Sequence, residues 1–187
     1  ATARLQPLRE RLLALHGVYR ALTMARSGRG ALELDTPELK LKFDSDGRIA
    51  AIVEQPRNDA HRLIEECMIA ANVAAARFLD RHRMPTLYQV QGLPELDRLE
   101  TLRQFLREFG LWLPPAADVR PEHLRELLQQ IGDRPDATLI STAVIRTMPQ
   151  AVYQPENIGH FGLAVRDYTH STAPNRRFVD LVTQRLV

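Results

Sequence analysis

The sequence contains very little cysteine, very little lysine and no long apolar segment. Its single cysteine, Cys67, excludes an internal disulfide framework and suits a reducing cytoplasm. We expect Cys67 to be a small packing residue rather than a reactive thiol. No apolar run approaches the roughly 20 residues that cross a bilayer, and the N-terminal residues do not show a secretory signal. We therefore expect a cytoplasmic protein without a membrane partner.

Charge alone does not indicate a ligand. The net charge is only +2, and the basic residues are almost all arginine, with Lys40 and Lys42 the only lysines. Genome composition and phosphate recognition both enrich arginine, so the positions of the arginines carry more information than their number. With 44% hydrophobic and 26% charged residues the chain is of ordinary globular composition, which excludes wholesale disorder. Its 187 residues fit one domain or a large part of one.

Hydrophobic periodicity predicts an α+β fold in which small sheet elements pack with several helices around a buried central helix. The first helix has a single apolar stripe that we expect to pack against the rest of the domain, and it is too short to indicate a coiled coil. Strands are predicted over residues 31–34, 39–43, 48–53, 87–90 and 161–165, with a hairpin turn at 44–47. Helices are predicted over residues 5–26, 58–82, 94–109, 121–131, 136–147 and from 175 onward.

The central helix, residues 58–82, combines a broad apolar surface with polar residues. Glu65 and Asn72 are seven residues apart and share a second, sheltered face. Glu65 has two possible roles, an internal salt bridge or hydrogen bonds to ligand hydroxyls, and Asn72 could bind a neighbouring loop. Glu66 points about 100° away and is expected to pair with an arginine. The predicted core face consists of Leu63, Ile64, Cys67, Met68, Ala71, Ala74, Ala75 and Phe78.

Residues 168–177 form a polar loop that ends in two arginines. Pro174 and Asn175 are expected to open a helix, which places Arg176 and Arg177 in its first turn. Arginine is unfavourable there because the positive end of the helix dipole prefers acids. The pair therefore indicates either an anionic ligand or a structural fork to a carboxylate such as Asp167 or Glu66.

The same loop carries other hydrogen-bonding groups. These are Tyr168, His170, Ser171 and Thr172. His170 could be a catalytic base, although a lone histidine in a polar loop is more often a structural donor. His160 and His170 lack metal-ligand spacing with each other or with nearby acids, so the residues of this chain predict no metal site.

Several segments resemble, in order, the RNB catalytic domain of the ribonuclease II/R family of exoribonucleases. Residues 61–72, His-Arg-Leu-Ile-Glu-Glu-Cys-Met-Ile-Ala-Ala-Asn, are similar to its helical signature. Residues 153–163 and 168–177, followed by Asp180 and Leu181, resemble a later signature. Residues 30–35 and 46–47 fall where the family places a strand pair. The resemblance covers essentially the whole chain.

The resemblance implies a hydrolase that threads single-stranded RNA, 3′ end first, and releases nucleoside 5′-monophosphates with the help of Mg²⁺. Arg176 matches the family's arginine that stabilises charge on the scissile phosphate. Glu65 matches a glutamate that contacts sugar hydroxyls near the 3′ end. The loop residues Arg177, Tyr168, His170 and Thr172 are the remaining RNA-binding candidates. The family commonly carries OB-type RNA-binding domains on both sides, and we expect a monomer.

The chain departs from the family in three places. The metal-binding aspartate pattern D-x5-D-x-D-D is missing, so we expect the Mg²⁺ ligands upstream of Ala1, and Asp44 and Asp46 form a turn instead. Residues 172–176 read Thr-Ala-Pro-Asn-Arg where the family more usually has a Ser-Pro-Ile-Arg type of sequence. Leu34 stands where the family often stacks a base on an aromatic ring.

We therefore interpret residues 1–187 as part of one RNB catalytic domain, truncated at both ends, with no second domain and no activity in isolation. The alternative is a non-catalytic, RNB-like module that binds single-stranded RNA. A third possibility is a helical scaffold with no RNA role.

Overall fold

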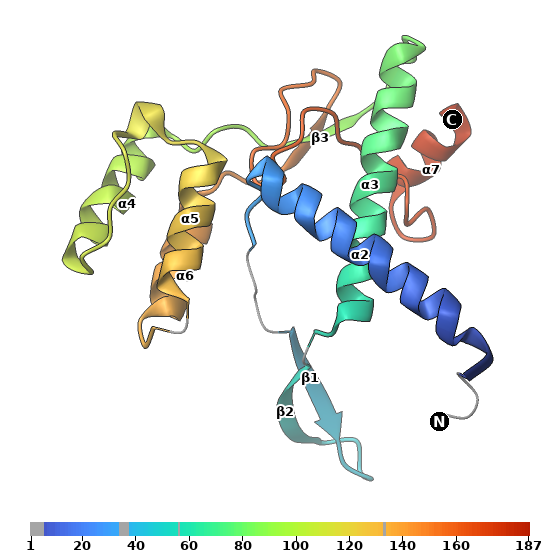
Figure 1. Cartoon of the computed structure of the whole chain (residues 1–187), viewed down its shortest axis with the longest axis horizontal. Coiled ribbons are helices and arrows are strands. Elements are labelled where there is room, and N and C mark those ends of the chain that lie inside the picture. The colour runs from blue at the N-terminus through green and yellow to red at the C-terminus, as the bar shows by residue number, and fades with distance from the viewer. Residues whose placement is uncertain (1–5, 34–37, 56, 133) are drawn as a thin grey trace.

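The computed structural model describes residues 6–33, 38–55, 57–132 and 134–187 (Figure 1). Its helical elements are η1 (Gln6–Leu8), α2 (Arg9–Arg29), α3 (Asp59–Arg81), α4 (Leu96–Glu108), η2 (Ala116–Asp118), α5 (Pro121–Ile131), α6 (Ala137–Thr147) and α7 (Phe178–Leu186). Its strands are β1 (Glu38–Phe43), β2 (Ile49–Gln55), β3 (Tyr88–Val90) and β4 (Val152–Gln154). The predicted α+β class is confirmed. No helix among the described residues is long and apolar enough to cross a membrane.

Helix α3 begins and ends at the residues expected from the sequence. The side-chain oxygen of Asn58 accepts hydrogen bonds from the amides of Ala60 and His61, both at 3.1 Å, and the His61 ring accepts one from the Asn58 amide at 3.3 Å. This reciprocal cap satisfies N–H groups that have no partner inside the helix. Helix α2 ends at Gly30, whose left-handed φ of +79° suits glycine.

Helix α2 crosses α3, and only part of its apolar stripe is covered (Figure 1). Leu12 and Leu15 are 45% and 46% exposed, whereas Leu22 is half-buried. The expectation that the whole stripe packs against the rest of the domain is therefore wrong for its N-terminal half. In that half His16 pairs with Asp59 of α3 at 3.4 Å, but the leucines stay exposed.

The strands β1 and β2 form an antiparallel hairpin that projects from the lower end of α3 in Figure 1. The predicted turn is confirmed, because the Asp44 carboxylate accepts the amides of Asp46 and Arg48 at 3.0 and 2.9 Å. Gly47 has a φ of +76°, which closes the turn. The predicted strand at 31–34 is wrong for residues 31–33, which are irregular, and Leu34 lies outside the described residues.

The strands β3 and β4 form a second antiparallel pair, with Tyr88 opposite Gln154 and Val90 opposite Val152. The strand expected at 161–165 is wrong. These residues form a tight turn in which Ala164 has a left-handed φ of +49°. The turn is fastened to Gln91, whose backbone oxygen accepts the Phe161 amide at 2.9 Å and whose side-chain oxygen accepts the Gly162 amide at 2.8 Å.

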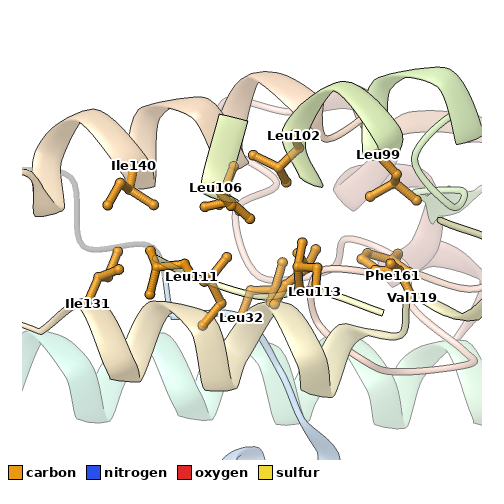
Figure 2. Close-up of a cluster of buried hydrophobic side chains, with 13 residues drawn as sticks. Leu32, Leu99, Leu102, Leu106, Leu111, Leu113, Val119, Ile131, Ile140 and Phe161 are labelled. Atoms are coloured by element: carbon orange, nitrogen blue, oxygen red, sulfur yellow. The ribbon is translucent and has the colours of Figure 1, made fainter. Parts of the chain in front are cut away.

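The main hydrophobic core lies between α4, α5 and α6 rather than around α3 (Figure 2). Leu106, Leu124, Ile140 and Val144 are fully buried there. Leu32 and Phe161 enter the same cluster from outside the helical unit, and the Leu32 amide donates to the oxygen of Gly162 at 2.8 Å. The three helices thus form a packed unit beside α2 and α3.

The face of α3 that we predicted to be its core is not the buried one. Ile64 is 58% exposed, and Ala71 and Ala74 are also exposed. The buried stripe consists of Glu66, Ile69, Asn72, Ala76 and Leu79. Apolar residues alone would place the core on the wider alanine-rich face. The helix instead buries a stripe that includes Glu66 and Asn72 beside three apolar residues, because partners from distant segments satisfy its polar groups.

Candidate functional site

The loop over residues 168–177 is fastened to α3 by one buried amide side chain. Asn72 is 2% exposed, and its oxygen accepts the amide and the hydroxyl of Ser171 at 2.8 and 3.0 Å. Its nitrogen donates to the Tyr168 hydroxyl at 3.1 Å. The expected hydrogen bond between this amide and a neighbouring loop is confirmed. Thr169 and Gln184 add further anchors, to the backbone oxygens of Leu87 and Ser171 at 2.6 and 2.5 Å.

Helix α7 begins at Phe178, so the expectation that a helix opens at Asn175 is wrong. The amides of Arg176 and Arg177 both donate to the oxygen of Ala173, at 3.2 and 3.1 Å, which forms a turn. Arg177 is the N-cap residue, with extended backbone angles. The two arginines therefore precede the helix, and the argument from the helix dipole does not apply to them.

The two arginines differ sharply in their surroundings. Arg177 makes a fork to Asp180, with its Nε and Nη2 atoms 2.7 and 2.8 Å from the two carboxylate oxygens. The predicted structural fork thus exists, but with Asp180 instead of Asp167 or Glu66. Arg176 is exposed, and its side chain makes no hydrogen bond or ion pair with any residue that the structure describes.

Asp180 is completely buried. Burial opposes its ionised form, but hydrogen bonds from Arg177 and the Ala173 amide outweigh that cost and hold its pKa below the usual range. Sequence reasoning missed its part in the site. The signal was the spacing of three residues between Arg177 and Asp180, which brings two such side chains together at the start of a helix.

His170 lies between Tyr153 and Arg177. Its Nδ1 is 2.5 Å from the Tyr153 hydroxyl and its Nε2 is 3.4 Å from Nη1 of Arg177. Burial and the positive charge of Arg177 lower the pKa of His170 to about 4. The ring is therefore neutral at pH 7. Because arginine only donates, Nε2 is the acceptor and Nδ1 carries the proton toward Tyr153.

The aromatic side of this group is made by Tyr168. His160 and His170 approach its ring edge-on, with centroids 5.5 and 5.6 Å away. Burial lowers the pKa of His160 to about 4 as well. Thr172 has a buried hydroxyl oxygen with no hydrogen-bond partner among the described residues. The loop therefore brings together five of the six candidate residues: Tyr168, His170, Thr172, Arg176 and Arg177.

Glu65 belongs to a second group, on the side of α3 that faces α2. Arg26 donates to Glu66 at 2.6 Å and to Glu65 at 3.3 Å, and Arg57 pairs with the other oxygen of Glu65. The expected arginine partner of Glu66 is thus confirmed. Burial disfavours the charged guanidinium of Arg26, but the two carboxylates outweigh burial and raise its pKa. Glu65 lines a cavity of about 410 Å³ between α2, α3 and α5.

Glu65 is not joined directly to the arginine loop. Within the described parts of the chain, its hydrogen bonds and ion pairs go to Arg26 and Arg57, and none goes to residues 168–177. Asn72, two turns further along α3, is the connection between this helix and the loop. Nor do the described residues contain a group of three or more His, Cys, Asp or Glu side chains that could hold a metal ion. They therefore do not fit a magnesium site.

Three comparisons place this geometry among known proteins. The family profile described as "RNB domain" matches residues 1–187. Ribonuclease R of Escherichia coli is 43% identical over 181 residues, which cover 97% of this chain and 22% of that protein. The chain thus spans about a fifth of the length of this curated relative.

Solved structures share the fold. RNase R of Mycoplasma genitalium, in complex with ribose-methylated single-stranded RNA, matches with a TM-score of 0.88 and 25% identity, over 94% of this chain and 28% of that one. Yeast Ssd1, described as a pseudonuclease, matches with a TM-score of 0.61 and 25% identity, over 70% of this chain and 17% of that one. The profile, the relative and the structures agree, and the chain belongs to the RNB domain family.

Proposed function

We propose that this chain is part of a 3′-to-5′ exoribonuclease that hydrolyses single-stranded RNA to nucleoside 5′-monophosphates. One observation carries the proposal. Arg176 is exposed and unpaired among the described residues, while Arg177 beside it is held by the buried Asp180. A guanidinium without a protein partner, carried by a firmly anchored turn, suits the binding of an anion. The similarity to ribonuclease R, one structure of which holds single-stranded RNA, supports RNA as this anion.

In this proposal Arg176 is the catalytic residue that stabilises negative charge as it develops on the scissile phosphate. The group acts most strongly when its position is set before the reaction begins, because no reorganisation is then needed. The anchors at Asn72 and Asp180 support such preorganisation. Thr172 supports RNA contact in the same loop, since its buried hydroxyl oxygen has no partner among the described residues. Tyr168, His170 and Arg177 complete the RNA-binding surface.

Glu65 is proposed to contact the hydroxyls of the 3′-terminal ribose. Its side chain is 36% exposed and lines a cavity, and Arg26 and Arg57 each pair with one of its carboxylate oxygens. A carboxylate that accepts a hydrogen bond from a 2′-hydroxyl distinguishes RNA from DNA.

The ligands of the catalytic metal ions are proposed to lie in parts of the intact protein other than residues 1–187. Mg²⁺ would activate the attacking water and neutralise the phosphate, but the described residues offer no ligand set for it. We propose that aspartates elsewhere in the intact protein hold it, consistent with a chain that covers 22% of a relative's length. In this proposal residues 1–187 are one part of a single RNB catalytic domain. OB-type RNA-binding domains would flank that domain in a monomeric, cytoplasmic protein.

The test is Arg176→Ala in the full-length protein. We expect kcat for single-stranded RNA to fall by about 10²- to 10³-fold, the usual effect of removing one donor to a developing oxyanion. Arg185→Ala is the matched control, because Arg185 is an exposed arginine on α7, and it should leave kcat unchanged. Equal rates for the two variants would refute the role of Arg176.

A second function is favoured by the match to a pseudonuclease. In that case the intact protein binds single-stranded RNA with an affinity that falls with salt, but releases no nucleotides. Incubating the full-length protein with 3′-labelled RNA and divalent metal separates the two functions. Release of labelled mononucleotide supports the exoribonuclease, and binding without release supports the RNA-binding module.

A further inference from the structure

The turn that carries Arg176 is closed at both ends by the same carboxylate. At its first residue, the Ala173 amide donates to Oδ1 of Asp180 at 2.7 Å. At its last residue, Arg177 donates from Nε to Oδ2 at 2.7 Å and from Nη2 to Oδ1 at 2.8 Å. Arg176 lies between these two attachment points.

Asp180 is well suited to hold the turn rigidly. It is fully buried, whereas the side chain of Arg177 is 24% exposed. A two-point fork between a planar guanidinium and a carboxylate fixes orientation as well as distance. Because an unpaired charge would be strongly unfavourable in this buried position, the Asp180 carboxylate must keep its partners, Arg177 and the Ala173 amide. The backbone before and after Arg176 is therefore held in one conformation.

We propose that Asp180 is a positioning residue, which aims the Arg176 guanidinium at the scissile phosphate by clamping both ends of the 173–177 turn. This inference rests on the proposed function, because it presumes that Arg176 acts on RNA. It goes further than that function because Asp180 and Arg177 would act by orienting Arg176, without contacting the reacting atoms themselves. A competing role for Asp180 is simple stabilisation of the start of α7.

The experiment uses Asp180→Asn in the full-length protein. The asparagine oxygen still accepts the Ala173 amide, but its NH₂ group cannot accept from Arg177, so the fork is lost at nearly constant volume. We expect kcat to fall about 10- to 100-fold, the effect of misplacing a catalytic group by about 1 Å, with little change in KM. In an Arg176→Ala background the same substitution should change kcat less than about 2-fold, because its effect passes through Arg176.

Asp136→Asn is the matched control. Arg134 forks to Asp136 with distances of 2.9 and 2.8 Å, in the connection between α5 and α6, so the substitution breaks the same type of contact away from the loop. Its kcat should stay at the wild-type level. Should Asp180→Asn fail to fold, Arg177→Lys removes the fork from the other side, and the same loss of kcat and the same dependence on Arg176 are expected.

The outcomes separate this inference from the function on which it rests. A loss with Arg176→Ala, but none with Asp180→Asn, overturns the positioning role alone. An equal loss from Asp180→Asn in the presence and absence of Arg176 also overturns it, in favour of general stabilisation. Full activity of Arg176→Ala overturns the proposed function and this role together.

Discussion

Replacing Asn72 by alanine should loosen the arginine loop far more than it disturbs the helix that carries it. The substitution removes three hydrogen bonds, two from Ser171 and one to the Tyr168 hydroxyl. At about 1 kcal/mol net for each bond the loss is about 3 kcal/mol, and more if the Ser171 amide stays buried without a partner. Every 1.4 kcal/mol corresponds to a factor of ten, so local opening of the loop should become about 100-fold more frequent.

Hydrogen–deuterium exchange of the full-length protein measures this opening directly. A peptide covering residues 168–177 should exchange about 100-fold faster in Asn72→Ala, while peptides from α4, α5 and α6 keep their wild-type rates. The matched control is Asn58→Ala on the same helix. Asn58 caps α3 by accepting two hydrogen bonds. Removing this cap should destabilise the start of the helix by about 1 kcal/mol. Unchanged exchange in the loop, or equal acceleration by both variants, would refute the reasoning.

Two further predictions concern buried ionisable side chains. Glu66→Gln should lower the free energy of unfolding by about 2 kcal/mol, because it leaves the largely buried Arg26 guanidinium with less compensation. Urea titration measures this change, and Glu126→Gln is the control. Glu126 is exposed, so its substitution should leave the free energy of unfolding unchanged. The second prediction follows from His160 and His170, since burial lowers the pKa of each imidazole to about 4 against an ordinary value of 6.5. Between these two pH values the unfolded chain binds more protons than the folded chain, so folding is favoured as the pH increases. The melting temperature should therefore increase as the pH is raised from about 4 to about 6.5, and it should stay constant at higher pH. A melting temperature that decreases over this range would contradict the assignment.

Elements with strong local signals could be predicted from the sequence. The Asn58 cap and the breaks around it delimit α3, and Pro121 at the first position of α5 marks its start. The turn at residues 44–47 carries aspartates and a glycine, whose conformations suit a tight connection. In each case the residues that decide the structure are neighbours in the chain.

The side of α3 that is buried could not be predicted, because it depends on which distant residues supply the partners. The buried side of α3 is set by Arg26 and by Ser171, which are 40 and 99 residues away from their partners Glu66 and Asn72. Sequence periodicity reports how apolar each face is, and it does not identify the distant residues that will pair with the polar groups on that face.

The helical unit α4–α6 has a consequence for how the chain acquires its structure during synthesis. Most of its core side chains lie between Leu99 and Val144, so nearly all of its packing is complete within one continuous stretch of sequence. Contacts between neighbouring segments form quickly, because little chain entropy is lost in closing short loops. This unit can therefore fold while the ribosome is still adding α7. The arginine turn, which needs α3 from before the unit and α7 from after it, is among the last parts of the chain to form.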